Sequence, residues 1–501
     1  MGIDVGTQSA KIIVINEEGK VLAKASSTYT PIYPKPGWAE ENAEDWWIGV
    51  KEAIRKVGKR INLSEIDGIA VSGQAPTCLP VDKYGKPLRN AIIWIDGRAE
   101  KEAATLKEII GNESSFQVSG NIIHSHLGGP KFLWFRKNEA EKYEKTWKIL
   151  QSHSYIIYKL TNEAVTDYST AGLCAPCYDY RKRDWSEEIC NIMGINLEKL
   201  PRIGGAWEVA GEITGEAAAE TGLRKGIEVM IGGGDYAAST LATGVIREGE
   251  ASLMLGTACN LLAPVASPKY DPRLINTMHV VRDTYLVIGS AHVGGILRWF
   301  KEMFCRVEDL ILSGSGLTVY QLMDDLASKI PAGSEKLIVL PYFMGGRTPI
   351  WDPHARGMII GLTFKHTKAH IYRAILESLG YAFYNLMLIM EERGIELKSL
   401  TTVNGGARSQ LWRQILADIL GKNILYIKGC EGAAFGDCVL AGVGIGKFKD
   451  EEVINNWIKI ETVNEPNMRN HEIYRRLSEV YTKLYENNKE LFRLMGEIKP
   501  L

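Results

Sequence analysis

The chain has 501 residues, more than one hydrophobic core usually holds together, so the sequence predicts at least two domains. Its 59 basic and 60 acidic side chains give a formal net charge of -1, which excludes the basic surface that a nucleic-acid partner needs. No uninterrupted apolar run reaches the length of a membrane span, the N-terminus lacks a secretory signal, and eight cysteines are too few for a disulfide framework, so we expect a cytoplasmic protein without a membrane partner.

The first half begins with a predicted β-hairpin and an amphipathic helix. A strand that reaches Asp4 is followed by a turn over 6–9, a β-branched strand over 10–16 and a further strand over 21–27. Apolar residues spaced three and four apart predict a helix over 43–57 with one buried face. A buried strand over 66–74 comes next, so the beginning of the chain has the pattern of an α/β domain.

The segment "MIGGGDYAAST", residues 230–240, ends an apolar strand with three glycines and an aspartate. Glycine inside a strand costs roughly 0.5–1 kcal/mol relative to alanine, so such a run is expected at a sharp turn or where something approaches the main chain closely. Asp235 follows at the start of a predicted helix. It is either the N-cap of that helix, a favoured use of Asp, or a carboxylate that acts in a site, and the two roles are compatible.

The second half repeats the order of predicted strands, glycine turns and helices found in the first half. Residues 249–266 form a predicted strand, a turn at Gly256 and Thr257, and a second strand, which parallels the opening hairpin. Residues 400–420 give strand, Gly-Gly turn and helix, in parallel with the segment around Asp235. A long helix is predicted from Asn470 onward. We therefore expect two related α/β domains, 1–246 and 247–501, that face each other across a cleft.

Four glycine turns at strand ends are candidates for binding a phosphate chain through backbone N–H groups. They lie at residues 6–8, 232–234, 256–257 and 405–407. Any one of them is explained equally well as a tight turn, but two in each half favour phosphate binding. Asp4 and Asp235 stand on these turns. Phosphoryl transfer needs a metal between the phosphates and a base for the attacking hydroxyl, and the two acids could divide these roles.

Several segments together resemble the signatures of the FGGY carbohydrate kinases, which belong to the sugar kinase/actin/Hsp70 superfamily. In chain order they are "GIDVGTQSAK", "GW-E", "IIWIDGRA", "IGGGDYAA", "LGTA", "LPYFMGGRTP", "GLTFKH" and "NGGARSQLWRQILADI". Within the family the chain is most similar to xylulose kinases. The resemblance implies two ribonuclease H-like (actin-like ATPase) domains, with sugar and catalytic base in the first, ATP in the second, and Mg²⁺ as the metal.

The resemblance also implies roles for individual residues. Asp235 matches the catalytic base and Asp4 the acid that holds Mg²⁺. The implied acceptor-binding residues are Gln74, Ala75, Pro76, Asp235 and Tyr236. The implied ATP-binding residues are Thr7, Gln8, Lys11, Gly256, Thr257, Gly294, Arg298, Gly405, Gly406, Ala407 and Gln410.

The acceptor pocket departs from the pattern of xylulose kinases. Ala75 and Pro76 replace a Met-His pair, and Tyr236 stands where xylulose kinases carry Asn. These departures bear on the substrate and leave the reaction intact. Outside this pocket, we expect Asp96 and Arg98 to form a local ion pair, and Arg347 to be a structural clamp between loops.

The predicted function is ATP-dependent phosphorylation of a small ketose or polyol, with a pentulose such as xylulose favoured. Two alternatives remain open at this stage. One is a kinase for another acceptor such as ribulose, glycerol, erythritol or gluconate, and the other is a non-catalytic relative that senses nucleotide and sugar. The expected partners are the small-molecule substrate and ATP, with a homodimer as a further expectation.

Overall fold

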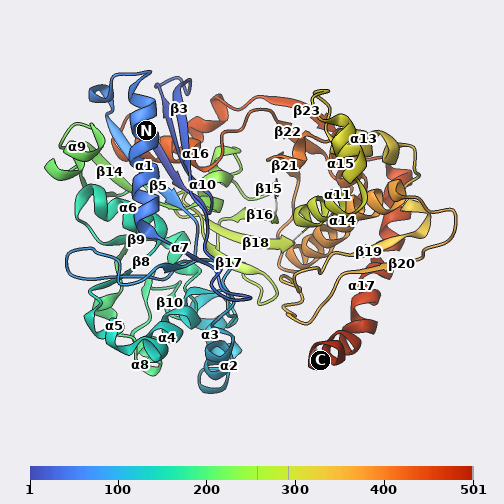
Figure 1. Cartoon of the computed structure of the whole chain (residues 1–501), viewed down its shortest axis with the longest axis horizontal. Coiled ribbons are helices and arrows are strands. Elements are labelled where there is room, and N and C mark those ends of the chain that lie inside the picture. The colour runs from blue at the N-terminus through green and yellow to red at the C-terminus, as the bar shows by residue number, and fades with distance from the viewer. Residues whose placement is uncertain (257, 292, 499–501) are drawn as a thin grey trace.

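The computed structural model describes residues 1–256, 258–291 and 293–498, which form two α/β bodies side by side (Figure 1). The sheet of the first body has the strand order β13-β14-β5-β1-β2-β3. Its strands are β1 (Gly2–Val5), β2 (Ser9–Ile15), β3 (Val21–Thr28), β5 (Gly68–Gly73), β13 (Val209–Glu212) and β14 (Glu228–Gly234). The predicted opening hairpin and the strand after the first helix are therefore confirmed.

The sheet of the second body has the order β17-β18-β16-β15-β21-β22-β23. Its strands are β15 (Glu250–Leu255), β16 (Cys259–Val265), β17 (Ile275–Met278), β18 (Tyr285–Ala291), β21 (Ser399–Val403), β22 (Ile424–Ile427) and β23 (Ile460–Asn464). Strands β18-β16-β15-β21-β22-β23 of this sheet correspond in order and direction to β3-β2-β1-β5-β14-β13 of the first sheet. In both sheets, three antiparallel strands are followed by two strands parallel to the third and by an antiparallel edge strand. The prediction of two related α/β domains is confirmed.

Helices surround both sheets. Those of the first half are α1 (Ala43–Gly58), α2 (Glu100–Ile109), α3 (Asn112–Ser119), α4 (Gly128–Asn138), α5 (Ala140–Lys145), α6 (Ser152–Thr161), α7 (Tyr168–Gly172), α8 (Glu187–Met193), α9 (Gly215–Thr221) and α10 (Asp235–Ala242). Those of the second half are α11 (Gly294–Phe304), α12 (Arg306–Leu312), α13 (Val319–Ser328), α14 (Lys368–Glu392), α15 (Gln410–Leu420), α16 (Ala433–Gly444) and α17 (Met468–Glu497). Helix α17 is the predicted terminal helix, and its Tyr474 and Tyr481 are buried in the second core.

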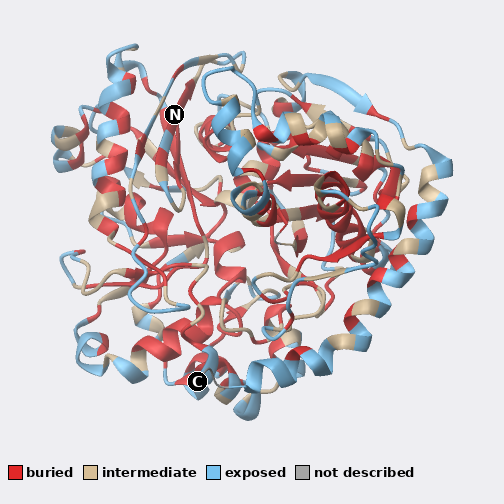
Figure 2. Ribbon diagram, turned by 45° about the vertical axis from the view of Figure 1, so that its right-hand side comes forward, coloured by how far each residue is buried: buried red, intermediate tan, exposed pale blue. Residues whose placement is uncertain are grey.

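Short paired strands complete the fold. They are β4 (Glu40–Glu41) with β7 (Ala91–Ile92), β6 (Leu79–Val81) with β8 (Lys148–Leu150), β9 (Val165–Asp167) with β12 (Arg202–Gly204), β10 (Tyr178–Asp179) with β11 (Asp184–Trp185), and β19 (Ile338–Leu340) with β20 (Met358–Ile360). Figure 2 shows the buried residues concentrated in the two sheets and on the inner faces of their helices. Each body thus has a core of its own.

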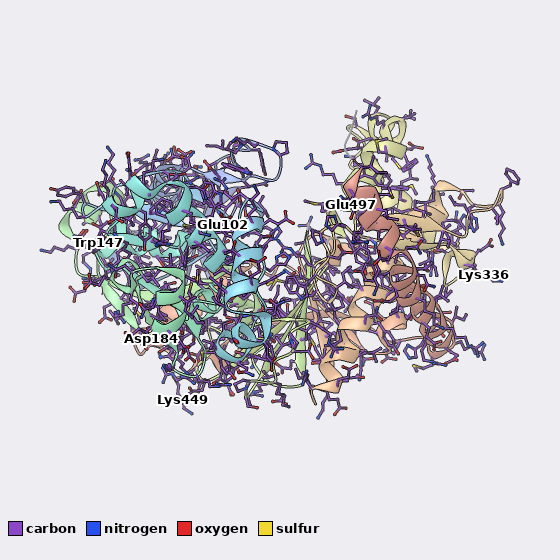
Figure 3. The ribbon with its side chains drawn as sticks, turned by 90° about the horizontal axis from the view of Figure 1, so that it is seen from below. Glu102, Trp147, Asp184, Lys336, Lys449 and Glu497 are labelled. Atoms are coloured by element: carbon purple, nitrogen blue, oxygen red, sulfur yellow. The ribbon has the colours of Figure 1, made fainter. Side chains whose placement is uncertain are left out.

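Two helices connect the bodies. Ala237 and Leu241 of α10 share a core cluster with Met254 and Leu262 of the second sheet. Helix α16, although late in the chain, packs against α10 and against β1, β2 and β5 of the first sheet. Figure 1 shows α16 on the side of the first body, and Figure 3 shows Lys449, which follows α16, on the side of Trp147 and Asp184. The ends of β1 and β14 therefore lie where the two bodies meet.

Candidate active site

Asp4 lies on β1, where its register partner on β2 is Lys11. Lys11 Nζ is 3.7 Å from Asp4 Oδ2. The residue is 5% exposed, and its Oδ1 has no hydrogen-bond partner among the described residues. Burial raises the pKa of Asp4, and the Lys11 ammonium opposes the rise. A buried carboxylate with a free oxygen has the chemistry to hold a hard divalent cation.

The turn after β1 carries the predicted phosphate-binding residues 6–8. The Gly6 N–H donates to the Ser9 carbonyl at 3.1 Å, which closes the turn. Thr7 Oγ1 donates to Gln74 Oε1 at 3.3 Å and accepts from the Trp94 indole N–H at 3.0 Å. Thr7 therefore joins the turn to the predicted acceptor side. Gln8 is exposed, and its side chain is not part of the cavity described below.

The glycine run before Asp235 turns the main chain between β14 and α10. Gly232 has φ +61°, and a Cβ there would lie 2.0 Å from the Val71 carbonyl oxygen. A Cβ on Gly233 would lie 2.8 Å from Asp167 Oδ2. The N-cap of α10 is Gly234, and Asp235 is the first helical residue. The interpretation of Asp235 as the N-cap is therefore wrong: the cap position falls one residue earlier, where the glycine adopts an extended conformation.

Asp235 is partly buried at the end of this turn. Burial raises its pKa to about 7, and the nearby Asp4 carboxylate adds to the rise. Asp437 of α16 is a further buried acid; it accepts from Ser72 Oγ at 2.6 Å, and its pKa is raised by burial and by Asp4 and Asp235. The start of α10 thus holds a carboxyl group whose protonation changes near neutral pH, as a general base requires.

One cavity of about 410 Å³ brings the two predicted acids together. It is lined from both halves of the chain, and its polar and charged residues include Asp4, Thr7, Lys11, Gln74, Asp235, Asn260, Arg347 and Asn404. Ala75 and Tyr236 also line it, whereas Pro76 is buried outside its lining. The structure therefore brings the predicted base, metal-binding acid and acceptor residues to one place, with Pro76 as the exception.

Gln74, Ala75 and Tyr236, three of the predicted acceptor-binding residues, form one wall of this cavity, here called the acceptor wall, and two of them form hydrogen bonds within the protein. Gln74 Nε2 donates to Glu41 Oε2 at 2.7 Å, which fixes the orientation of the amide. The Tyr236 hydroxyl donates to the Ser169 carbonyl at 2.8 Å, so its phenol is already engaged within the protein. The Gln74 amide is engaged as well, by Glu41 and Thr7, and it has Ala75 and the Tyr236 ring as apolar neighbours on this wall.

A second cavity of about 750 Å³ lies in the second domain. Among the predicted nucleotide-binding residues, it is lined by Gly256, Gly294, Arg298, Gly405 and Gly406. Leu297, Tyr320, Asp324, Arg408, Ser409 and Trp412 line it as well. A Cβ on Gly405 would meet open space, so the main chain here is accessible to a ligand.

Two other residues predicted to contact the nucleotide are placed differently. Ala407 is fully buried and Gln410 is exposed, and neither lines the cavity. Thr257 lies outside the described residues. Arg298 reaches the cavity but pairs with Glu302 at 2.8 Å on the surface of α11.

Sequence reasoning missed several residues of the first cavity as site residues, among them Trp94, Asn260, Arg347 and Asn404. Trp94 lies inside the signature segment "IIWIDGRA" and donates to Thr7, a signal that the segment belongs to the site. Arg347 lies within "GGRTP" and was expected to be a structural clamp. The predicted pair of Asp96 and Arg98 is confirmed, with Nη2 and Oδ2 2.8 Å apart and both side chains buried.

Comparisons with known proteins match both halves. The N-terminal domain of the FGGY family of carbohydrate kinases matches residues 1–242, and its C-terminal domain matches residues 251–445. The chain is 31% identical to a xylulose kinase of Staphylococcus epidermidis over 98% of its own length and 97% of that protein. It is 28% identical to a gluconokinase of Bacillus subtilis, over 97% of this chain and 95% of that protein.

Comparison with solved structures also finds carbohydrate kinases of similar fold. The crystal structure of a xylulose kinase from Rhodospirillum rubrum superimposes with a TM-score of 0.88 at 29% identity, covering 98% of this chain and 99% of that one. No helix in the described ranges is long and apolar enough to cross a bilayer. The two domains have the actin-like ATPase fold that the sequence predicts. Since both family domains are present in order and such relatives match nearly its full length, the chain belongs to the FGGY family of carbohydrate kinases and is an ATP-dependent sugar kinase.

Proposed function

We propose that this kinase transfers the γ-phosphoryl group of ATP to a hydroxyl of a small ketose or polyol, with a pentulose such as xylulose favoured. One observation carries the proposal: Asp4 and Asp235 share a single cavity with the Gly6–Thr7 turn and Gln74. Relatives that bear the name xylulose kinase support the pentulose. A gluconokinase among the relatives keeps other acceptors open, which the experiment below addresses.

Asp235 acts as the general base in this proposal. Its carboxylate takes the proton of the acceptor hydroxyl as the oxygen attacks phosphorus, and its raised pKa makes it a stronger proton acceptor than an ordinary Asp. Gln74 orients the acceptor, since Glu41 and Thr7 fix its amide. Lys11 and the N–H groups of the first turn attract the phosphate chain.

Asp4 would hold Mg²⁺ in this proposal. Its unpaired, buried Oδ1 fits a hard cation, whose other ligands would be phosphate oxygens and water. When bound, Mg²⁺ neutralises charge on the transferring phosphates. Among the described residues, no cluster of three or more His, Cys, Asp or Glu is placed to hold a metal ion.

We further propose a division of labour between residues 1–246 and 247–501. The first domain binds the acceptor and supplies the base, and the second binds adenosine in the cavity of about 750 Å³. Gly256 and Gly405 give the nucleotide access to the main chain there. We place the reaction in the cytoplasm, and a homodimer stays a prediction.

A coupled ADP-release screen across ketoses, polyols and aldonates tests the proposal. We expect acceptor-dependent ADP release that requires Mg²⁺, with at least one pentulose among the good acceptors. The same screen with Asp4→Asn should need more Mg²⁺ for half-maximal rate. Activity on glycerol or erythritol with none on any pentulose would contradict the favoured acceptor and leave the sugar kinase assignment standing.

A further inference from the structure

Ser169 contacts the residues on both sides of Asp235. It lies on the short helix α7, where its hydroxyl oxygen accepts from the Gly234 N–H at 3.0 Å. Its carbonyl oxygen accepts from the Tyr236 hydroxyl at 2.8 Å. Asp167 is the N-cap of α7, and its carboxylate accepts from the Ser169 N–H at 2.6 Å, which fixes the serine in turn. Ser169 therefore holds the turn that carries the proposed base, although it does not line the cavity.

The second domain reaches the same serine through β17. Thr277 is buried and lines neither cavity, and its Oγ1 donates to the Ser169 carbonyl at 2.7 Å. The two segments pack closely, since a Cβ on Gly172 of α7 would lie 2.2 Å from Thr277 Oγ1. Val280, which follows β17, lies against the glycine turn: a Cβ on Gly233 would be 2.7 Å from its Cγ1. Strand β17 and the residues after it thus support the turn from the side of the second domain.

Strand β17 is itself fixed to the first domain. It is the edge strand of the second sheet. The side chain of Asn121 pairs with it as a neighbouring strand would: Oδ1 accepts from the Asn276 N–H at 2.9 Å, and Nδ2 donates to the Asn276 carbonyl at 2.6 Å. Asn276 Nδ2 donates to the Gly120 carbonyl at 2.7 Å. Both asparagines are buried, so these bonds keep Thr277 within reach of Ser169.

We infer that Ser169 and Thr277 are positioning residues, which together set the orientation of Asp235 relative to the second domain. The inference rests on the proposed function, in which Asp235 takes the proton of the acceptor hydroxyl. A carbonyl oxygen has two lone pairs, and on Ser169 the hydroxyls of Tyr236 and Thr277 use both, so loss of either donor loosens the support of the turn. A displacement of about 1 Å can cost about a hundredfold in rate, because the reacting groups must be aligned.

The test removes the Thr277 hydroxyl, which lies outside both cavities. Thr277→Val keeps the shape of the side chain, and Thr277→Ser keeps the hydroxyl. Thr221→Val is the matched control, because the buried Thr221 hydroxyl also donates to a carbonyl, that of Ala217 within α9. Steady-state ADP release with the best acceptor of the screen gives kcat and the KM values for ATP and acceptor. Hydrogen–deuterium exchange of peptides that cover residues 230–240 measures the protection of the turn, and thermal melting checks that each variant is folded.

We expect Thr277→Val to lower kcat about tenfold, with both KM values within about twofold of the wild type. Exchange over residues 230–240 should be faster in this variant. Thr277→Ser should restore both properties, and Thr221→Val should leave them unchanged. A purely structural role would lower the melting temperature without this separation of kcat from KM.

Unchanged kcat or unchanged exchange in Thr277→Val overturns the inference, as does an equal loss in Thr277→Ser or Thr221→Val. If Thr277→Val does not fold, Tyr236→Phe removes the other donor to Ser169, and the same exchange measurement applies to it. If the wild type releases no ADP with any acceptor, the proposed function fails. Exchange over residues 230–240 then still decides whether Thr277 supports the turn.

Discussion

The position of Asp235 depends on the glycines that precede it. The glycines before it are needed because Gly232 has a positive φ and passes close to Val71, and because a side chain at 233 would collide with Asp167. The turn that results carries Asp235 into a cavity with Asp4. The glycine run is thus the means by which the sequence exposes one carboxyl group to ligand.

The raised pKa of Asp235 makes stability depend on pH. The protonated form is favoured in the folded state, so this contribution to stability is complete below pH 3.8 and is lost as pH rises through about 7. We compare the free energy of unfolding of Asp235→Asn with that of the wild type in metal-free buffer. From pH 5 to pH 8, we expect this difference to change in favour of the variant by more than about 1 kcal/mol. Urea unfolding at both values measures the difference. A difference that does not change with pH contradicts the burial of this carboxyl, and the exposed Asp67→Asn is the control.

The acceptor wall predicts broad selectivity among neutral sugars. The Tyr236 hydroxyl is engaged by Ser169, the Gln74 amide is engaged by Glu41 and Thr7, and Ala75 has no polar side chain. Among these three residues, a ligand therefore meets few polar groups that are not already hydrogen-bonded. Apolar walls reject wrong substrates far less than sites built to hydrogen-bond a hydroxyl. We expect at least two pentuloses or polyols to have kcat/KM values within about tenfold of each other. Steady-state assays with the ketoses and polyols of the ADP-release screen test this expectation. A strict preference for D-xylulose alone would contradict the predicted broad selectivity.

Among the elements, α16 packs against α10, the helix that begins with the proposed base Asp235. A Cβ on Gly436 of α16 would lie 2.1 Å from the Ala238 carbonyl oxygen of α10. Gly436→Ala must therefore separate the helices, and we expect a loss of about 1–3 kcal/mol in the free energy of unfolding, as for overpacked cores. Because α10 begins at Asp235, kcat should fall as well.

The control for this variant is Gly215→Ala at the start of α9, where a Cβ meets nothing within 4 Å. This change should be neutral or stabilise the protein by up to about 1 kcal/mol, since alanine favours helix over glycine. Urea unfolding of both variants gives the comparison. Equal stability of Gly436→Ala and the wild type would mean that the two helices are not in close contact.

Sequence patterns predicted those elements whose structure is determined by residues close together in the chain. The opening hairpin, the helix over 43–57 and the terminal helix follow from turn chemistry and apolar spacing, which depend on residues near in sequence. The packing of α16 on the first sheet could not be predicted, because its partners β1 and β5 are hundreds of residues earlier. The contact between Arg347 and the Trp94 ring could not be predicted for the same reason, because the two residues lie far apart in the sequence.

Across the whole molecule, the cavity with Asp235 is lined from both domains, and the cavity of about 750 Å³, where we propose that the nucleotide binds, belongs to the second. Phosphoryl transfer requires the γ-phosphate and the acceptor hydroxyl to meet and water to be excluded. We expect the radius of gyration to decrease when a non-hydrolysable ATP analogue and the acceptor are both present. Small-angle X-ray scattering measures this, and an unchanged profile with both ligands bound would count against closure of the domains.

The central claim is that Asp235 is the general base of an ATP-dependent sugar kinase. The most direct test is the steady-state rate of Asp235→Asn with saturating ATP and acceptor, alongside its ATP affinity. We predict a fall in kcat of at least about a hundredfold with ATP binding retained, because removal of a general base typically costs about 10²–10⁴ in rate. Near-normal turnover by Asp235→Asn would contradict the claim and place the base elsewhere.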